Sequence, residues 1–194
     1  MSQLDWFHWC FTAMWMIVMV ELIVGTIPEY PPIRLLAMPL STLLWTFGTI
    51  LLVSDIMRLM RIPSPIRLSS IPKGAVLRPA IYTFIEDVVA VDGRGGTAYR
   101  ERLNARYEAS HYFRQMLHRL TLFWGFGCEG MATITTILVF TLPDEAAYAV
   151  GWSLPAFWAM LWALITWWYV EKDLKMEKEK WAINGGIGPA EQIV

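Results

Sequence analysis

Four long apolar segments limit what this chain can fold into. They run from Trp6 to Ile27, Leu35 to Met57, Leu120 to Leu142 and Ala146 to Val170. Each is close to the roughly 17 to 25 apolar residues needed to span a hydrocarbon core of about 30 Å. Because backbone polar groups must be satisfied within the segment in lipid, such segments predict transmembrane helices. The expected fold is an all-α, polytopic membrane protein.

The composition agrees with a bilayer environment. Of the 194 residues, 56% are hydrophobic and only 17% are charged, against about 25% charged in an average soluble chain. The chain also has 11 tryptophans, a residue that gathers at membrane interfaces. A soluble domain of this size could not hide so large an apolar excess. We expect one compact membrane domain.

The basic residues predict an orientation. Fifteen of the 16 Lys and Arg lie between Arg58 and Arg119 or after Val170. By the positive-inside rule, the middle segment and the C-terminal tail are cytoplasmic, so both termini face the cytoplasm. The chain then divides into a transmembrane hairpin (1–57), a basic segment (58–119), a second hairpin (120–170) and a charged tail (171–194). The sequence leaves open which membrane this is.

The turns of the two expected hairpins carry similar residues. Pro28 and Glu29 correspond to Pro143 and Asp144, and another proline follows each turn eleven or twelve residues later. One interpretation is a duplicated hairpin with both copies in the same orientation. The other is that any membrane hairpin needs proline and polar residues at its turn.

The basic segment divides into three parts. Residues 61–79 are too rich in proline for a helix and suit a course along the lipid headgroups. Residues 81–89 predict an amphipathic helix with Glu86 and Asp87 on its water-facing side, although their β-branched content leaves a strand as the alternative. Residues 97–119 indicate helix again, with a break near residue 109 and with Thr97 and Ser110 as expected N-caps.

One stretch resembles a known group of proteins. Residues Tyr82 to Gly125, "YTFIEDVVAVDGRGGTAYRERLNARYEASHYFRQMLHRLTLFWG", are about a quarter of the chain. They are similar to the central block of an uncharacterised group of fungal integral membrane proteins with four predicted spans. The resemblance implies a four-span membrane protein and carries over no functional residue.

Two carboxylates inside predicted spans are the strongest candidate functional groups. An ionisable residue within a span costs about 2.5 to 3.5 kcal/mol on insertion scales and therefore suggests a function. Glu129 lies on a small, polar stripe with Thr133 and Thr136, which we expect to face either the threonine face of the second span, including Thr46, or the alanine-rich face of the fourth.

The second carboxylate, Glu21, lies about 10 Å nearer the outer surface than Glu129 if the turn prolines are level. At that separation the two acids should not share a proton. They could be two steps of a polar path, or each could make a separate hydrogen bond that packs two helices together.

Arginines and aromatics alternate in the third part of the basic segment. The candidate binding residues are Arg100, Arg102, Arg106, Arg114 and Tyr107. This pattern suits a helix lying in the membrane interface, with guanidinium groups on lipid phosphates. The alternative is a solvated helix that packs on a partner protein. We do not expect nucleic acid as a partner, because the flanking spans hold this stretch to the membrane.

The histidines and cysteines do not form a recognisable metal motif. Glu108 and His111 make a single E-x-x-H unit, whereas di-iron proteins use two. Cys10 and Cys128 both fall within predicted spans, where we expect them reduced and buried. The sequence therefore predicts no metal, no cofactor and no catalytic residue.

Three functions remain open at this stage. The first is a non-enzymatic organiser or accessory subunit that binds lipid headgroups or a protein partner. The second is a small transporter or channel that uses Glu129, and it would be a homo-oligomer because four spans leave little room for a pathway. The third is an intramembrane lipid-modifying enzyme that uses Glu129 as an acid or base.

Overall fold

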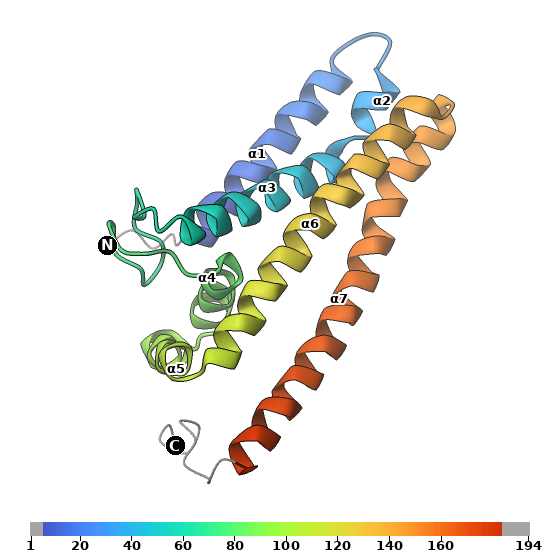
Figure 1. Ribbon diagram of the computed structural model, residues 1–194. Helices are drawn as coiled ribbons and strands as arrows, with labels where there is room; N and C mark the ends of the chain where they lie inside the picture. Colours follow the sequence, from blue (N-terminus) through green and yellow to red (C-terminus); the bar gives the residue numbers. More distant parts are fainter. Residues whose placement is uncertain (1–5, 184–194) are drawn as a thin grey trace. The chain divides into compact units, whose positions relative to one another are not determined.

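The computed structural model describes residues 6–183 and is helical apart from its connecting segments (Figure 1). The elements are α1 (Trp6–Thr26), α2 (Ile33–Leu36), α3 (Pro39–Leu59), α4 (Ala80–Asp87), the π-helix η1 (Val88–Asp92), α5 (Gly96–Ala109), α6 (His111–Thr141) and α7 (Asp144–Ile183). Within the described residues, extended pairing is limited to isolated bridges such as Pro63 with Val76. The predicted all-α class is confirmed.

Four of these helices, α1, α3, α6 and α7, are long and apolar enough to cross a membrane. Helices α6 and α7 contain 31 and 40 residues. At 1.5 Å per residue they are about 46 and 60 Å long, well beyond a hydrocarbon core of about 30 Å. Their polar ends, before Leu120 in α6 and after Val170 in α7, therefore continue as helix past the apolar stretch.

The two turns with similar sequences differ in local structure. After the first turn the chain forms the short helix α2, and Pro39 then begins α3. Proline suits that first position because its missing N–H has no helical partner there. The second turn leads directly into α7, and the corresponding proline, Pro155, lies inside this helix.

The described chain divides into two compact units. Unit 1 contains residues 6–7, 54–121 and 164–183, and unit 2 contains His8–Val53 and Leu122–Ala163. Unit 2 holds most of the apolar helical length. Unit 1 holds the basic segment together with the charged end of α7.

Glycines allow helices to approach closely in unit 2. A Cβ on Gly48 of α3 would lie 3.0 Å from a carboxylate oxygen of Glu129 in α6. A Cβ on Gly127 of α6 would lie 2.7 Å from the indole nitrogen of Trp162 in α7. The ring of Trp162 stacks on Phe123 at 4.2 Å. Small residues thus bring α6 against both α3 and α7, as is usual where helices pack in lipid.

Arg34, which precedes α3, closes the end of α6 in unit 2. Its guanidinium donates to the main-chain oxygen of Phe140, lies 3.5 Å from that of Leu142 and pairs with Asp144 at 3.2 Å. The last carbonyls of a helix have no partner within it, so Arg34 supplies the missing donors.

The core of unit 1 is formed where α4, α5, the first turns of α6 and the later part of α7 meet. Figure 1 shows α4 and α5 beside the start of α6. The buried residues are Tyr82, Leu103, Phe113, Met116, Leu117 and Leu120, and Ile81, Ile85, Tyr99, Tyr107, Tyr169, Val170 and Leu174 pack against them.

The prediction that Glu86 and Asp87 face water is wrong. Both are 0% exposed, whereas Val88 of the expected apolar face is 39% exposed. The acids are covered because serines of the preceding connection and an arginine of α5 contact them. The expected helix is present, but it ends at Asp87 and continues as the π-helix η1.

The junction of α5 and α6 is fastened by the charged part of α7. Ser110 caps α6 as predicted, because its hydroxyl accepts from the N–H of Phe113 at 3.1 Å. The same hydroxyl donates to Glu177, which also pairs with Arg106 at 2.7 Å. The Thr97 cap is wrong, because α5 begins at Gly96 without a side-chain cap. The predicted tail is helical to Ile183, and its remainder lies outside the described residues.

Candidate functional site

The connection between α3 and α4, residues 60–79, is a folded loop, and we call it the α3–α4 loop. Ser64 and Ala75 are joined by a main-chain hydrogen bond of 2.9 Å, and Leu68 and Ile71 exchange two at 3.0 and 2.7 Å. Ser69 has a φ of 50°, in the left-handed region that non-glycine residues seldom adopt. The sequence correctly predicts that this proline-rich stretch is not helical.

Two adjacent serines anchor the loop to the buried acids of α4. The Ser69 hydroxyl donates to Asp87, and the Ser70 hydroxyl donates to Glu86 at 2.9 Å. Arg100 of α5 lies 3.6 Å from Glu86 and 3.9 Å from Asp87. Burial raises the pKa of the Glu86 carboxyl, while the Ser70 hydrogen bond and the charge of Arg100 lower it to a smaller extent.

Arg78, at the end of the loop, is held on several sides. Its guanidinium lies 4.6 Å from the ring centres of both Tyr82 and Tyr107. One terminal nitrogen donates to Asn104 at 2.6 Å and to Glu108 at 3.1 Å. The other terminal nitrogen, Nη1, is buried and makes no hydrogen bond to the described residues. An unmatched guanidinium donor suits a carboxylate or a phosphate oxygen.

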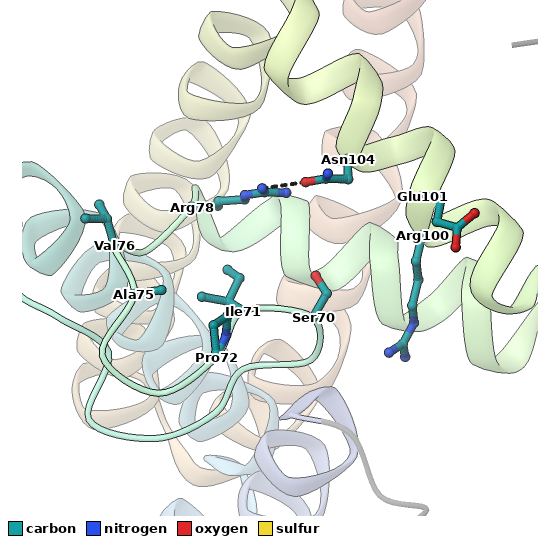
Figure 2. A pocket seen from close by; sticks show the side chains of 9 residues that line it. All are labelled: Ser70, Ile71, Pro72, Ala75, Val76, Arg78, Arg100, Glu101 and Asn104. Atoms are coloured by element: carbon teal, nitrogen blue, oxygen red, sulfur yellow. Dashed lines mark hydrogen bonds between the residues drawn. The ribbon is translucent and has the colours of Figure 1, made fainter.

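A pocket of about 340 Å³ lies between the α3–α4 loop and α5. Figure 2 shows its two sides, with the loop on one and the polar residues of α5 on the other. Its lining residues are Ser70, Ile71, Pro72, Ala75, Val76, Arg78, Arg100, Glu101 and Asn104. The pocket thus combines an apolar wall with arginine, amide and hydroxyl groups, and it can bind a ligand that has both an anionic and an apolar part.

The exposed side chains of the α3–α4 loop include both apolar and basic residues. Ile66 and Val76 are 46% and 58% exposed, and Ile62 is also exposed. The basic residues Arg61, Arg67 and Lys73 are exposed on the same loop. We call these six residues the loop surface. Exposed apolar residues beside cations are typical of a surface that contacts lipid.

The predicted binding residues of α5 and α6 do not form one outward face. Arg100 faces the acids of α4, and Arg106 pairs with Glu177 and lies 4.4 Å from the ring centre of Phe113. Arg114 donates to the main-chain oxygens of Tyr107 and Glu108 at 2.9 and 2.8 Å.

The two remaining predicted binding residues differ in their surroundings. Arg102 is exposed and bonds to the main chain of its own helix, at Ala98. Tyr107 packs edge-on against Tyr82 at 5.0 Å, and both rings contact the guanidinium of Arg78. Burial raises the pKa of the Tyr107 hydroxyl, and the nearby arginines only partly oppose this.

In unit 2, Glu129 bonds to the threonine face of α3. Its carboxylate accepts from the Thr49 hydroxyl at 2.8 Å. Of the two faces left open by the sequence, the structure therefore brings α3 to this side chain. Thr133 and Thr136 bond to the main-chain oxygens of Glu129 and Ala132, four residues earlier. Such bonds satisfy a hydroxyl within its own helix.

Glu21 contacts the same helix, α3, nearer its N-terminal end. Its side-chain hydrogen-bond partner is Thr42, and its second carboxylate oxygen is buried without a partner among the described residues. Thr42 and Thr49 are seven residues apart, or about 10 Å along a helix. Thr46, between them, bonds to the main-chain oxygen of Thr42.

The structure places His111, His118 and the two cysteines apart from any metal-binding group among the described residues. His118 lies 3.2 Å from the buried Asp55 and 2.7 Å from Arg58, and His111 contacts Gln115. Within residues 6–183, no group of three or more His, Cys, Asp or Glu side chains is placed to hold a metal ion. Both cysteines are buried and unbridged, as expected.

Sequence reasoning missed Arg78, Ser70 and Asn104 as site residues. Each lies in a stretch without a recognisable motif, and the pocket forms only when the α3–α4 loop folds against α5. One available signal was that Arg78 immediately precedes Pro79. Proline restricts the backbone conformation of the residue before it.

The fold and these sites define an all-helical protein with four helices that could cross a membrane. Residues 1–181 match the family described as Domain of unknown function (DUF8766), and the chain belongs to that family. No curated protein and no solved structure matches the chain.

Proposed function

We propose that this protein is an integral membrane protein that acts as a non-enzymatic organiser or accessory subunit. In this proposal α1 with α3 and α6 with α7 are two transmembrane hairpins, and both termini lie on the cytoplasmic side with residues 58–119. The function of the basic segment is to bind the anionic headgroups of the same membrane. A binding site for a partner protein on this segment is the alternative within the same function.

The observation that carries this proposal is the loop surface. Its apolar members Ile62, Ile66 and Val76 are exposed next to basic residues, whereas the acids of α4 are buried. The loop also begins directly after Leu59, the last residue of a helix long enough to span a bilayer. Because no other residues separate the helix from the loop, the start of the loop lies at the end of the span. Lysines and arginines near an anionic bilayer each contribute about 1 kcal/mol of attraction.

Native mass spectrometry of the full-length protein, released from nanodiscs with and without phosphatidylserine, tests this binding. The variant Arg61→Glu, Arg67→Glu, Lys73→Glu reverses the charge of the loop surface, and we expect it to retain fewer anionic lipids. The matched control reverses three exposed lysines of α7, Lys172, Lys175 and Lys178. If both variants lose anionic lipid equally, the loss depends only on the net charge of the protein. That result would contradict a specific role for the loop surface.

A second function, transport of protons or small cations, is favoured by the two carboxylates bonded along α3. The Glu21–Thr42 and Glu129–Thr49 pairs lie on one face of that helix, about 10 Å apart, with Thr46 between them. Flux into liposomes should then depend on Glu129 and be lost in Glu129→Gln at unchanged abundance. The same flux in the variant and the wild type would contradict transport.

A further inference from the structure

We propose that the pocket between the α3–α4 loop and α5 binds one phosphate group, either on a lipid headgroup or as a free phosphate. The lipid form of this inference rests on the proposed function, because the pocket lies under the same loop. Binding of a free phosphate does not depend on the proposed function. The inference is carried by the donors, charges and space on the two sides of the pocket.

The first donor is Arg78. Its Nη1 is buried and has no partner among the described residues, while contacts with the rings of Tyr82 and Tyr107 restrain the guanidinium. Little side-chain entropy therefore remains to be lost on binding. Nη2 already donates to Asn104 and Glu108, so Nη1 is the terminal nitrogen left to donate to a phosphate oxygen.

The second donor is the amide of Asn104. Its oxygen accepts from Arg78 at 2.6 Å, as the dashed line in Figure 2 shows. This contact sets the orientation of the amide, because only the oxygen can accept. The NH₂ group of Asn104 is then a donor on the pocket wall, beside the guanidinium.

Both arginines of the pocket lining, Arg78 and Arg100, have acidic partners nearby. Arg100 stands near Glu86 and Asp87 and offsets their negative charge. Arg78 is paired with Glu108 at 3.1 Å, and the acid in the pocket lining is Glu101, an exposed carboxylate on α5. It should repel a phosphate, so removing its charge should strengthen binding.

The space exceeds that of a phosphate. The pocket measures about 340 Å³, and Ile71, Pro72 and Val76 form its apolar wall. Ligand pockets usually begin near 300 Å³ and combine apolar walls with a few placed polar groups. A phosphate at Arg78 and Asn104 would leave room for the glycerol part of a lipid against that wall.

Asn104→Asp is the deciding variant. The aspartate can still accept from Arg78, so the fold is kept, but the NH₂ donor becomes a second anionic oxygen. We expect the affinity of the full-length protein in detergent for inorganic phosphate, measured by isothermal titration, to fall about tenfold or more. Glu101→Gln should raise it about threefold. Gln115→Glu, an equal charge change at an exposed site outside the lining, is the control.

The source of the phosphate is tested by native mass spectrometry from phosphatidylcholine nanodiscs with or without phosphatidic acid. Retention of phosphatidic acid that is lost in Asn104→Asp assigns the pocket to a headgroup. Inorganic phosphate binding without this retention assigns it to a free phosphate. Absence of both, or equal binding by the wild type and Asn104→Asp, overturns the pocket proposal.

The pocket and the loop surface can fail separately. If only the pocket is wrong, the loop-surface charge reversal still lowers retention of anionic lipid while Asn104→Asp does not. If only the proposed function is wrong, Asn104→Asp abolishes phosphate binding while the charge reversal leaves lipid retention unchanged.

Discussion

At the scale of single residues, Glu129 is fastened to its neighbours. Its carboxylate accepts from Thr49 and lies against the backbone of Gly48, whose missing side chain leaves the space. This geometry favours a packing role, in which the acid holds α6 against α3. A polar path remains an alternative only if the acid can exchange its partner for a solute.

Gly48→Ala should destabilise the protein. The new Cβ would lie 3.0 Å from both Cys128 Cβ and the Glu129 carboxylate, closer than ordinary contact. Overpacking of this kind costs about 1 to 3 kcal/mol, and it should appear as earlier thermal unfolding in detergent. The control is Gly130→Ala on α6, where a Cβ meets nothing within 4 Å. Alanine is the better helix former, so this control should be neutral or stabilising. Equal stability of the two variants would contradict close packing at Gly48.

Glu86 predicts a pH dependence of the stability of unit 1. Burial raises the pKa of its carboxyl in the folded state above the ordinary 4.5. The folded protein then binds this proton more tightly than the unfolded chain. The contribution is complete below the unfolded pKa and is lost as pH rises through the folded pKa.

Glu86→Gln should therefore remove this dependence and make unit 1 more stable at neutral pH, because Ser70 can still donate to the glutamine oxygen. The effect is measured by thermal unfolding of the full-length protein at pH values from about 4 to about 8. Glu101→Gln, an exposed acid, is the control. A pH profile of Glu86→Gln that follows the wild type would contradict the assignment to Glu86.

At the scale of elements, the apolar runs of the sequence predict the long helices well, because length and hydropathy are local properties. They cannot predict which polar residues are buried. The helical spacing around Ile81 and Ile85 correctly indicates a helix, yet the burial of Glu86 depends on a loop that folds back from earlier in the chain.

Much of the candidate site is likewise non-local. Glu129 can be singled out as an acid inside a span, and its partner is limited by sequence to one of two faces. Only the structure selects Thr49. Arg78 and Asn104 could not be paired in advance, because 26 residues separate them and no motif links them.

The contact between α7 and the α5–α6 junction predicts a local effect of Glu177. The variant Glu177→Ala loses the hydrogen bond to Ser110 and the ion pair with Arg106. Breaking hydrogen bonds to a mostly buried charge costs about 1.5 to 3 kcal/mol. Amide hydrogen exchange should rise in the first turn of α6 and near residue 177. Glu179→Ala, an exposed acid on the same helix, should leave exchange unchanged. Equal exchange in both variants would argue against this contact.

At the scale of the whole molecule, the protein combines four helices that could cross a membrane with a folded basic segment. Between Arg58 and Arg119 the basic segment has eleven basic and five acidic residues, which gives it a net charge of +6. Several of these charges are used within unit 1. We therefore propose that the loop surface is the part of the segment that contacts anionic lipid.

The depth of the α3–α4 loop in a bilayer tests the proposed lipid contact. A fluorescent probe on Ile66→Cys, in full-length protein reconstituted in vesicles that contain brominated phosphatidylserine, reports contact with lipid. We expect strong quenching relative to unbrominated vesicles, and weak quenching for the same probe on Glu179→Cys at the charged end of α7. Equal fluorescence of the Ile66 probe with and without bromine would contradict contact between the loop surface and lipid.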